Sequence, residues 1–261
     1  MNVFLREMKA YRKSLIIWSI GLVLLIFMGN TEYSSLSSSG QSLNELVESM
    51  PKALQALMGT GTLDLSTPIG YFAVLYLYLL LMATIHASMM GASIIAKEER
   101  DKTFEFLFVK PITRTKVITM KLVAAFINLV VFNAVTTIAT ILIFEMDHGI
   151  EDLLKLMGGM FILQILFLVL GSALAATIRK PKRAAPIATG ILLLTFILSI
   201  VIDLSEKLEV LKYVVPFKYF TAENMLTGDG FEAVFVVISA CLTVILTALT
   251  FIFYKKRDLN V

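Results

Sequence analysis

Long uncharged stretches, separated by charged segments, dominate the pattern of hydrophobic and polar positions in this chain. Uncharged stretches of about 17–25 residues are typical of helices that cross a ~30 Å hydrocarbon layer. Six such spans are predicted, at residues 14–31, 69–96, 122–144, 156–178, 184–202 and 233–254. Backbone polar groups in lipid must be paired within their own segment, so each span is a helix. The pattern therefore predicts an all-α integral membrane protein, with residues 1–261 forming a single transmembrane domain.

The segments between the spans also carry a pattern. Residues 2–13 place Val3 and Met8 on one helical face and Arg6 and Lys9 on the other, which predicts an N-terminal interfacial helix. The alternative is an ordinary positive flank of the first span. The loop 32–68 shows apolar residues at helical spacing and is expected to form one or two short amphipathic helices. Segment 203–232 is too apolar for a solvated loop, and we expect it to dip partly into the membrane.

The positions of the basic residues predict the orientation. Eighteen of the 23 Lys and Arg residues lie in the N-terminal segment, the loops 97–121 and 179–183, and the tail 255–261. Cytoplasmic loops carry an excess of Lys and Arg, and every segment agrees with that rule. Both termini are therefore expected in the cytoplasm, with 32–68 and 203–232 on the outer side.

Composition and missing motifs exclude several functions. The chain is 57% hydrophobic and 16% charged, against about 25% charged for a soluble domain. Cys241 is the one cysteine and the histidines are His86 and His148, so neither a disulfide nor a metal site is expected. The sequence contains no G-x-x-x-x-G-K-[ST] and no H-E-x-x-H. We expect no nucleic-acid partner, no catalytic residues and no cofactor held by this chain.

A few polar side chains lie within the spans. His86, Asn128 and Asn133 are candidates for lining a polar pathway, although ordinary hydrogen bonds between helices are the favoured explanation for the two asparagines, and both explanations stay open for His86. No span contains a carboxylate of the kind that ion-coupled carriers use. Energy for transport is therefore expected from a partner. Glu98 and Glu99 resemble the start of an E-E-x-x-x-R protease motif, but Thr103 stands where the arginine would be.

The loop 97–121 carries seven basic and four acidic residues around an apolar centre. A short amphipathic helix is expected before Pro111, and a second helix is expected to start at Thr113. This run resembles the loop after the second span of type-2 ATP-binding-cassette (ABC) exporter permeases. The residues that match are Glu99, Thr103 or Phe104, Glu105, Leu107, Pro111, Ile112, Thr113, Arg114, and Val117 or Ile118. The sequence departs at Lys102, where the family commonly has glycine.

Three further segments are similar to the same family, in the same order along the chain. They are M-P-K-A-L-Q-A-L-M-G at residues 50–59, P-F-K-Y-F at 216–220 and Y-K-K-R-D at 254–258. The resemblance implies a permease subunit in a bacterial cytoplasmic membrane, paired with a second permease copy, either identical or a close paralogue. A separate cytoplasmic ABC ATPase subunit would bind ATP and Mg, and membrane lipid would surround the spans. The residues implied in ATPase coupling are Glu98, Glu99, Arg100, Thr103, Glu105, Leu107, Pro111 and Arg114.

The expected cargo is an amphipathic peptide, antibiotic or toxin, because the family resemblance is to small exporters and the outer loops are short. Two other function classes stay open on the sequence. One is a channel or carrier that works without a partner, and the other is a membrane-embedded enzyme. The absence of charged residues within the spans weighs against both.

Overall fold

The computed structural model describes residues 3–38, 42–51, 54, 55, 58, 60, 63–102, 112–146, 149–178, 180–228 and 230–256. Within these residues the protein consists of helices and connecting segments, without a strand. In this described part of the chain, six helices are long and apolar enough to cross a membrane. They are α1 (Val3–Ser38), α4 (Pro68–Arg100), α6 (Arg114–Ile143), α7 (Ile150–Thr177), α8 (Ala184–Asp203) and α10 (Ala233–Lys256). The prediction of an all-α protein with six spans is confirmed.

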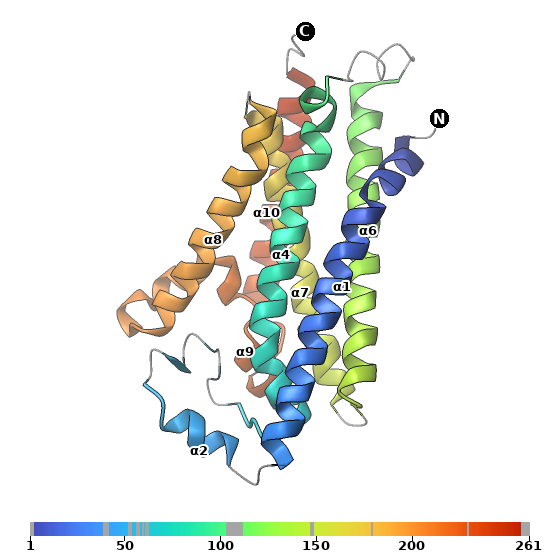
Figure 1. Cartoon of the computed structure of the whole chain (residues 1–261). Coiled ribbons are helices and arrows are strands. Elements are labelled where there is room, and N and C mark those ends of the chain that lie inside the picture. The colour runs from blue at the N-terminus through green and yellow to red at the C-terminus, as the bar shows by residue number, and fades with distance from the viewer. Residues whose placement is uncertain are drawn as a thin grey trace.

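Short elements connect the long helices. They are α2 (Leu43–Glu48), the 3₁₀ helices η1 (Pro181–Arg183), η2 (Glu206–Tyr213) and η3 (Pro216–Lys218), and α9 (Ala222–Thr227). Helix α1 begins and α10 ends at the same end of the bundle, which we call the terminal end (Figure 1). Helix α2, the η2 segment and α9 lie toward the opposite end (Figure 1). This arrangement agrees with six crossings.

The long helices extend beyond the predicted spans. Residues 32–38, assigned to the outer loop, continue α1 as helix, and residues 97–100 and 114–121, assigned to the loop 97–121, belong to α4 and α6. The first 11 residues of α1 also continue into its span as one helix, and their interfacial position stays a prediction. The reason is that charge marks where a chain leaves lipid, whereas a helix continues until a breaker residue or a cap ends it.

Helix boundaries follow from local chemistry. The predicted helix start at Thr113 is confirmed, because its side-chain oxygen accepts a hydrogen bond from the Lys116 backbone N–H at 3.3 Å. Thr67 caps α4 in the same way, with Pro68 in the first turn. Side-chain caps of this kind satisfy backbone donors that a helix start leaves unpaired.

Helix α7 is the centre of the bundle. In an apolar 18-residue stretch of α7, 61% of the residues are buried, against 17% in the corresponding stretches of α1 and α10. It packs closely against α4, since a Cβ on Gly91 would overlap the Leu168 carbonyl oxygen and a Cβ on Gly171 would overlap that of Ser88. Small residues allow such close approach between membrane helices. The other long helices surround this pair and expose apolar side chains to their surroundings.

The segment 203–232 folds back against the bundle in short pieces, and not as one helix. Phe217 and Phe220 are buried among α4 and α7 residues of the main core, which explains part of its apolar character. Val210 and Val214 stay 77% and 72% exposed. Contact of these two side chains with the membrane stays a prediction.

Candidate coupling site at the terminal end

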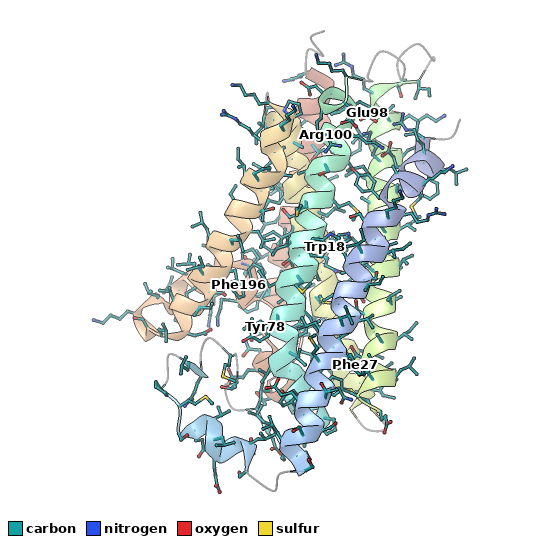
Figure 2. All side chains as sticks on the ribbon, viewed as in Figure 1. Trp18, Phe27, Tyr78, Glu98, Arg100 and Phe196 are labelled. Carbon is teal, nitrogen blue, oxygen red and sulfur yellow. The ribbon has the colours of Figure 1, made fainter. Side chains whose placement is uncertain are left out.

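The start of α1, the end of α4 and the start of α6 meet at the terminal end of the bundle (Figure 1). Figure 2 shows Glu98 and Arg100 at this end of α4, close to the first turns of α1. The same end holds the start of the loop 97–121 and the last turn of α10. The candidate site is therefore formed by segments that are far apart in the sequence.

Five charged side chains at this end form one network, which we call the ion cluster: Arg6, Glu7, Lys97, Glu98 and Lys121. The Arg6 Nη2 atom lies 2.7 Å from Glu7 Oε1 and 2.6 Å from Glu98 Oε1. The Lys97 Nζ atom lies 3.1 Å from Glu7 Oε2. Lys121 pairs with the other oxygen of Glu98 and also donates to the Ile94 carbonyl. Each carboxylate thus binds two cations, and the cluster joins three helices.

Burial makes this cluster unusual. The side chains of Glu7 and Lys121 are fully inaccessible, and that of Glu98 is 4% exposed. A buried charge loses hydration energy of several kcal/mol, which only close counter-charges and hydrogen bonds can offset. Arg6 and Lys97 are partly exposed at 27% and 22%, so they close the cluster toward solvent. The arrangement holds the three helix ends in one relative position, because any separation would leave a buried charge unpaired.

Local sequence explains how the helices supply these groups. Arg6–Glu7 and Lys97–Glu98 are adjacent pairs, so each helix brings both a cation and an anion to the contact. Lys97 lies in the last turn of α4, where the helix dipole favours positive charge. Its Nζ also lies 5.6 Å from the centre of the Tyr11 ring of α1, a cation–π contact that adds to the α1–α4 packing.

Two further contacts lie around the cluster. The Arg114 Nη1 atom donates to the Lys255 carbonyl at 2.9 Å, which joins the start of α6 to the end of α10. Arg100 pairs with Asp101 at 2.9 Å, and this hydrogen bond holds the pKa of Asp101 below its ordinary value. Both partners of that pair are about 40% exposed, so the pair contributes little to stability.

The structure places the predicted coupling residues unequally. Glu98 is in the ion cluster, Arg114 holds the α6–α10 contact, Arg100 is exposed, and Glu99 is half-buried on the same turn of α4. Thr103, Glu105, Leu107 and Pro111, together with the amphipathic helix expected before Pro111, lie outside the described residues. Their predicted role in coupling stays a prediction.

Sequence reasoning missed the partners of Glu98. Lys121 was counted as a basic residue of the cytoplasmic loop, but it is buried inside α6 at 0% exposure. Arg6 and Lys97 were read only as part of the charge bias. Glu7, a single carboxylate within a basic segment, was the sequence feature that could have indicated a specific partner.

The three predicted pathway residues lie at contacts between helices. His86 of α4 is buried between the rings of Trp18 (centroids 5.5 Å apart) and Phe132 (4.7 Å). Asn128 donates to the Ala124 carbonyl of its own helix at 2.8 Å and contacts the Met8 sulfur at 3.2 Å. These positions favour a packing role within one protomer, and pathway lining stays a prediction.

Asn133 and Gln164 form a second polar contact, between α6 and α7. The Asn133 amide donates to the Met157 carbonyl at 3.2 Å and lies 3.5 Å from Gln164 Oε1. Within the described part of the chain, Nδ1 of His86, Oδ1 of Asn128 and Nε2 of Gln164 are buried without a hydrogen-bond partner. No group of three or more His, Cys, Asp or Glu side chains there could hold a metal ion.

Comparison with known proteins identifies the family. The sequence profile described as ABC-2 family transporter protein matches residues 1–259. No curated protein sequence matches the chain significantly. The match covers almost the whole chain and agrees with the six apolar helices. This chain belongs to the ABC-2 transporter family, as a multi-pass membrane permease of an ABC transporter.

Proposed function

We propose that this permease is the membrane subunit of an ATP-driven exporter and that its ion cluster couples a cytoplasmic ABC ATPase to the spans. Family membership supports a separate ATPase partner, since ABC-2 permeases typically work with one. The observation that carries the proposal is the buried pairing of Arg6, Glu98 and Lys121 across α1, α4 and α6. ATP and Mg would bind to the partner, and this chain would contribute no catalytic group.

The ion cluster gives a physical route for coupling. A force applied to the loop 97–121 reaches the end of α4 directly. Because Glu98 is paired with both Arg6 and Lys121, α4 cannot move at this end without moving α1 and α6 or breaking a buried pair. Packed, bistable contacts of this kind convert small displacements into movements of whole helices.

The assembly requires a second permease copy, identical or closely related. Helices α1, α8 and α10 expose many large apolar side chains along their length. Lipid would cover part of this surface, and the second copy would cover the rest. The charge bias supports a cytoplasmic location for the terminal end, in the cytoplasmic membrane of a bacterium. The proposed cargo is an amphipathic peptide, antibiotic or toxin moved toward the outer side.

Reconstitution with the partner ATPase tests the proposal. We expect the ATPase to copurify with the permease and to lose coupled ATP turnover when the loop carries Glu105→Lys. Glu48→Lys is the matched control, because Glu48 is an exposed carboxylate of α2 at the opposite end of the bundle. Cargo transport by the permease alone in liposomes, without ATP, would refute the proposal in favour of a partner-independent carrier or channel.

A further inference from the structure

A cavity of about 270 Å³ lies in the seam between α1 and α6, and we call it the seam cavity. Figure 1 shows the first turns of α1 beside α6 at the terminal end. Lys9 and Arg12 on α1 are exposed, Met8 and Leu15 form half-buried walls, and Asn128 of α6 closes the floor. The two cations are therefore the lining groups most open to a ligand. The volume lies just below the roughly 300–1,000 Å³ range of small-molecule sites, so it suits one small polar group.

The two cations of the seam cavity have no counter-charge in the described part of the chain. Lys9 and Arg12 are three residues apart, which places them on one face of α1. No described carboxylate lies within ion-pair distance of either side chain. The carboxylates of the ion cluster, Glu7 and Glu98, are buried and already bind other cations. The cavity thus presents two accessible positive charges to an anionic ligand.

Their place along α1 puts these cations at the depth of lipid headgroups. The uncharged span begins at residue 14, so Arg12 lies about 3 Å and Lys9 about 8 Å before it along the helix axis. The headgroup layer on each side of a bilayer is about 5–8 Å thick. The charge bias predicts that this end faces the cytoplasm, where anionic lipids of the leaflet attract basic segments.

Accessible apolar side chains continue from the cavity away from the terminal end. On α1, Ile16 follows Arg12 by four residues and Ile20 follows Ile16 by four, so they share a helix face. These isoleucines are 49% and 54% exposed. On α6, Val131 lies one turn beyond Asn128 and is 39% exposed. An acyl chain attached to a headgroup in the cavity would cover this apolar strip, whereas a free phosphate ion or an acidic protein surface would leave it bare.

We propose that the seam cavity binds the phosphate group of an anionic phospholipid, with the acyl chains along the apolar strip. The guanidinium of Arg12 can donate two parallel hydrogen bonds to phosphate oxygens, and the Lys9 ammonium adds a second positive charge. A zwitterionic phospholipid is a poorer ligand, because its own cationic group would meet the same two cations. This lipid site requires neither export nor ATP coupling by the permease.

Binding is measured on the full-length permease in micelles of uncharged detergent. The probe is phosphatidylglycerol with a pyrene-labelled acyl chain, and the signal is energy transfer from Trp18, the only tryptophan, six residues beyond Arg12. We expect saturable binding, at least about tenfold tighter than that of phosphatidylcholine with the same label. Added salt is expected to weaken it, because both cations are exposed.

Competition identifies the source of the phosphate group. Unlabelled phosphatidylglycerol is expected to displace the probe, and inorganic phosphate at the same concentration is expected to leave it bound. Displacement by inorganic phosphate would show a site for a soluble anion and overturn the lipid inference. Equal binding of the two labelled lipids would also overturn it.

Two double variants locate the site. Lys9→Gln with Arg12→Gln is expected to weaken the phosphatidylglycerol probe by about tenfold or more. Lys182→Gln with Arg183→Gln is the matched control, because it removes two exposed cations of η1, outside the cavity, and is expected to keep the preference for phosphatidylglycerol. Unaltered SDS unfolding curves show that both variants are folded. Equal weakening by the two pairs would indicate diffuse charge attraction and overturn the inference.

The partner ATPase provides the test against a protein ligand. Selective phosphatidylglycerol binding without the ATPase supports the lipid site. Loss of ATPase copurification in the Lys9→Gln and Arg12→Gln variant, together with equal binding of the two labelled lipids, would assign these cations to a protein contact and overturn the inference. Failure of ATP coupling in the reconstituted exporter would refute the proposed function and leave the lipid site standing.

Discussion

Glu98→Gln and Lys121→Met should destabilise the protein by different amounts, although the two side chains form one ion pair. The cluster contains three cations, Arg6, Lys97 and Lys121, and two carboxylates. Glu98→Gln leaves the fully buried Lys121 without its carboxylate. Removing one partner of a buried pair costs about 3–5 kcal/mol when the other charge stays uncompensated.

Lys121→Met has a smaller expected effect. Glu98 keeps Arg6 at 2.6 Å, and the remaining cluster has two cations and two carboxylates. Methionine fills most of the lysine volume without a charge to desolvate. The expected cost is about 1–2 kcal/mol, roughly that of one charge-assisted hydrogen bond. The double variant should be more stable than Glu98→Gln alone, because it no longer buries an unpaired ammonium group.

The chain carries its own reporter for this experiment. Trp18 is the only tryptophan, and its ring lies 5.5 Å from that of His86, across the α1–α4 contact. Unfolding by SDS in mixed micelles, followed by Trp18 fluorescence, gives the free energy for each variant. A cost for Lys121→Met equal to or above that for Glu98→Gln, or strict additivity in the double variant, would refute the reasoning.

Two further predictions concern packing and pH. Gly171→Ala should destabilise the protein by about 1–3 kcal/mol or more in the same SDS assay, because the added Cβ would overlap the Ser88 carbonyl of α4. Gly190→Ala is the control: a Cβ there meets open space, so this variant should have unchanged or increased stability. Hydrogen bonds from Asn44 and Ser66 hold the pKa of Asp64 below its ordinary value. The ionised Asp64 side chain therefore stabilises the turn at residues 63–66 above the ordinary pKa, and this stabilisation is lost as the pH falls through the lowered pKa. Amide exchange in residues 63–66, corrected for the intrinsic rate, should therefore rise at acidic pH, and Ser66→Ala should move that rise to higher pH; an unmoved profile would contradict the assignment.

The six spans could be predicted because each is a local property of the chain. An uncharged run of sufficient length has one stable solution in a bilayer, so neither packing nor long-range contacts were needed. The helix start at Thr113 was predictable for the same reason, since a cap depends on residues within one turn. The continuation of α1 through residues 32–38 could not be predicted in this way. Charge and polarity mark the membrane border and carry no information on where the helix ends.

The ion cluster was beyond local reasoning. Glu98 and Arg6 are separated by 92 positions, and Lys121 lies 23 positions beyond Glu98. Nothing in the sequence near Lys121 distinguishes it from the solvated lysines around it; only the packing of α6 against α4 buries it. The family resemblance predicted Glu98 and Arg114 as site residues, yet their partners became visible only in the structure.

The length of α1 has a mechanical consequence. Its 36 residues span about 54 Å, well beyond a ~30 Å hydrocarbon layer. One end is fixed to the ion cluster, the Trp18–His86 contact lies between, and near the other end the Tyr33 hydroxyl donates to the Ser66 carbonyl at 2.9 Å. A rigid rotation of α1 about the Trp18–His86 contact would move its two ends in opposite directions. A rotation of about 5° would move Ser38, about 30 Å from Trp18, by about 2–3 Å and Arg6, about 18 Å away, by about 1–2 Å, so a displacement at one face becomes a larger one at the opposite face without any helix unfolding.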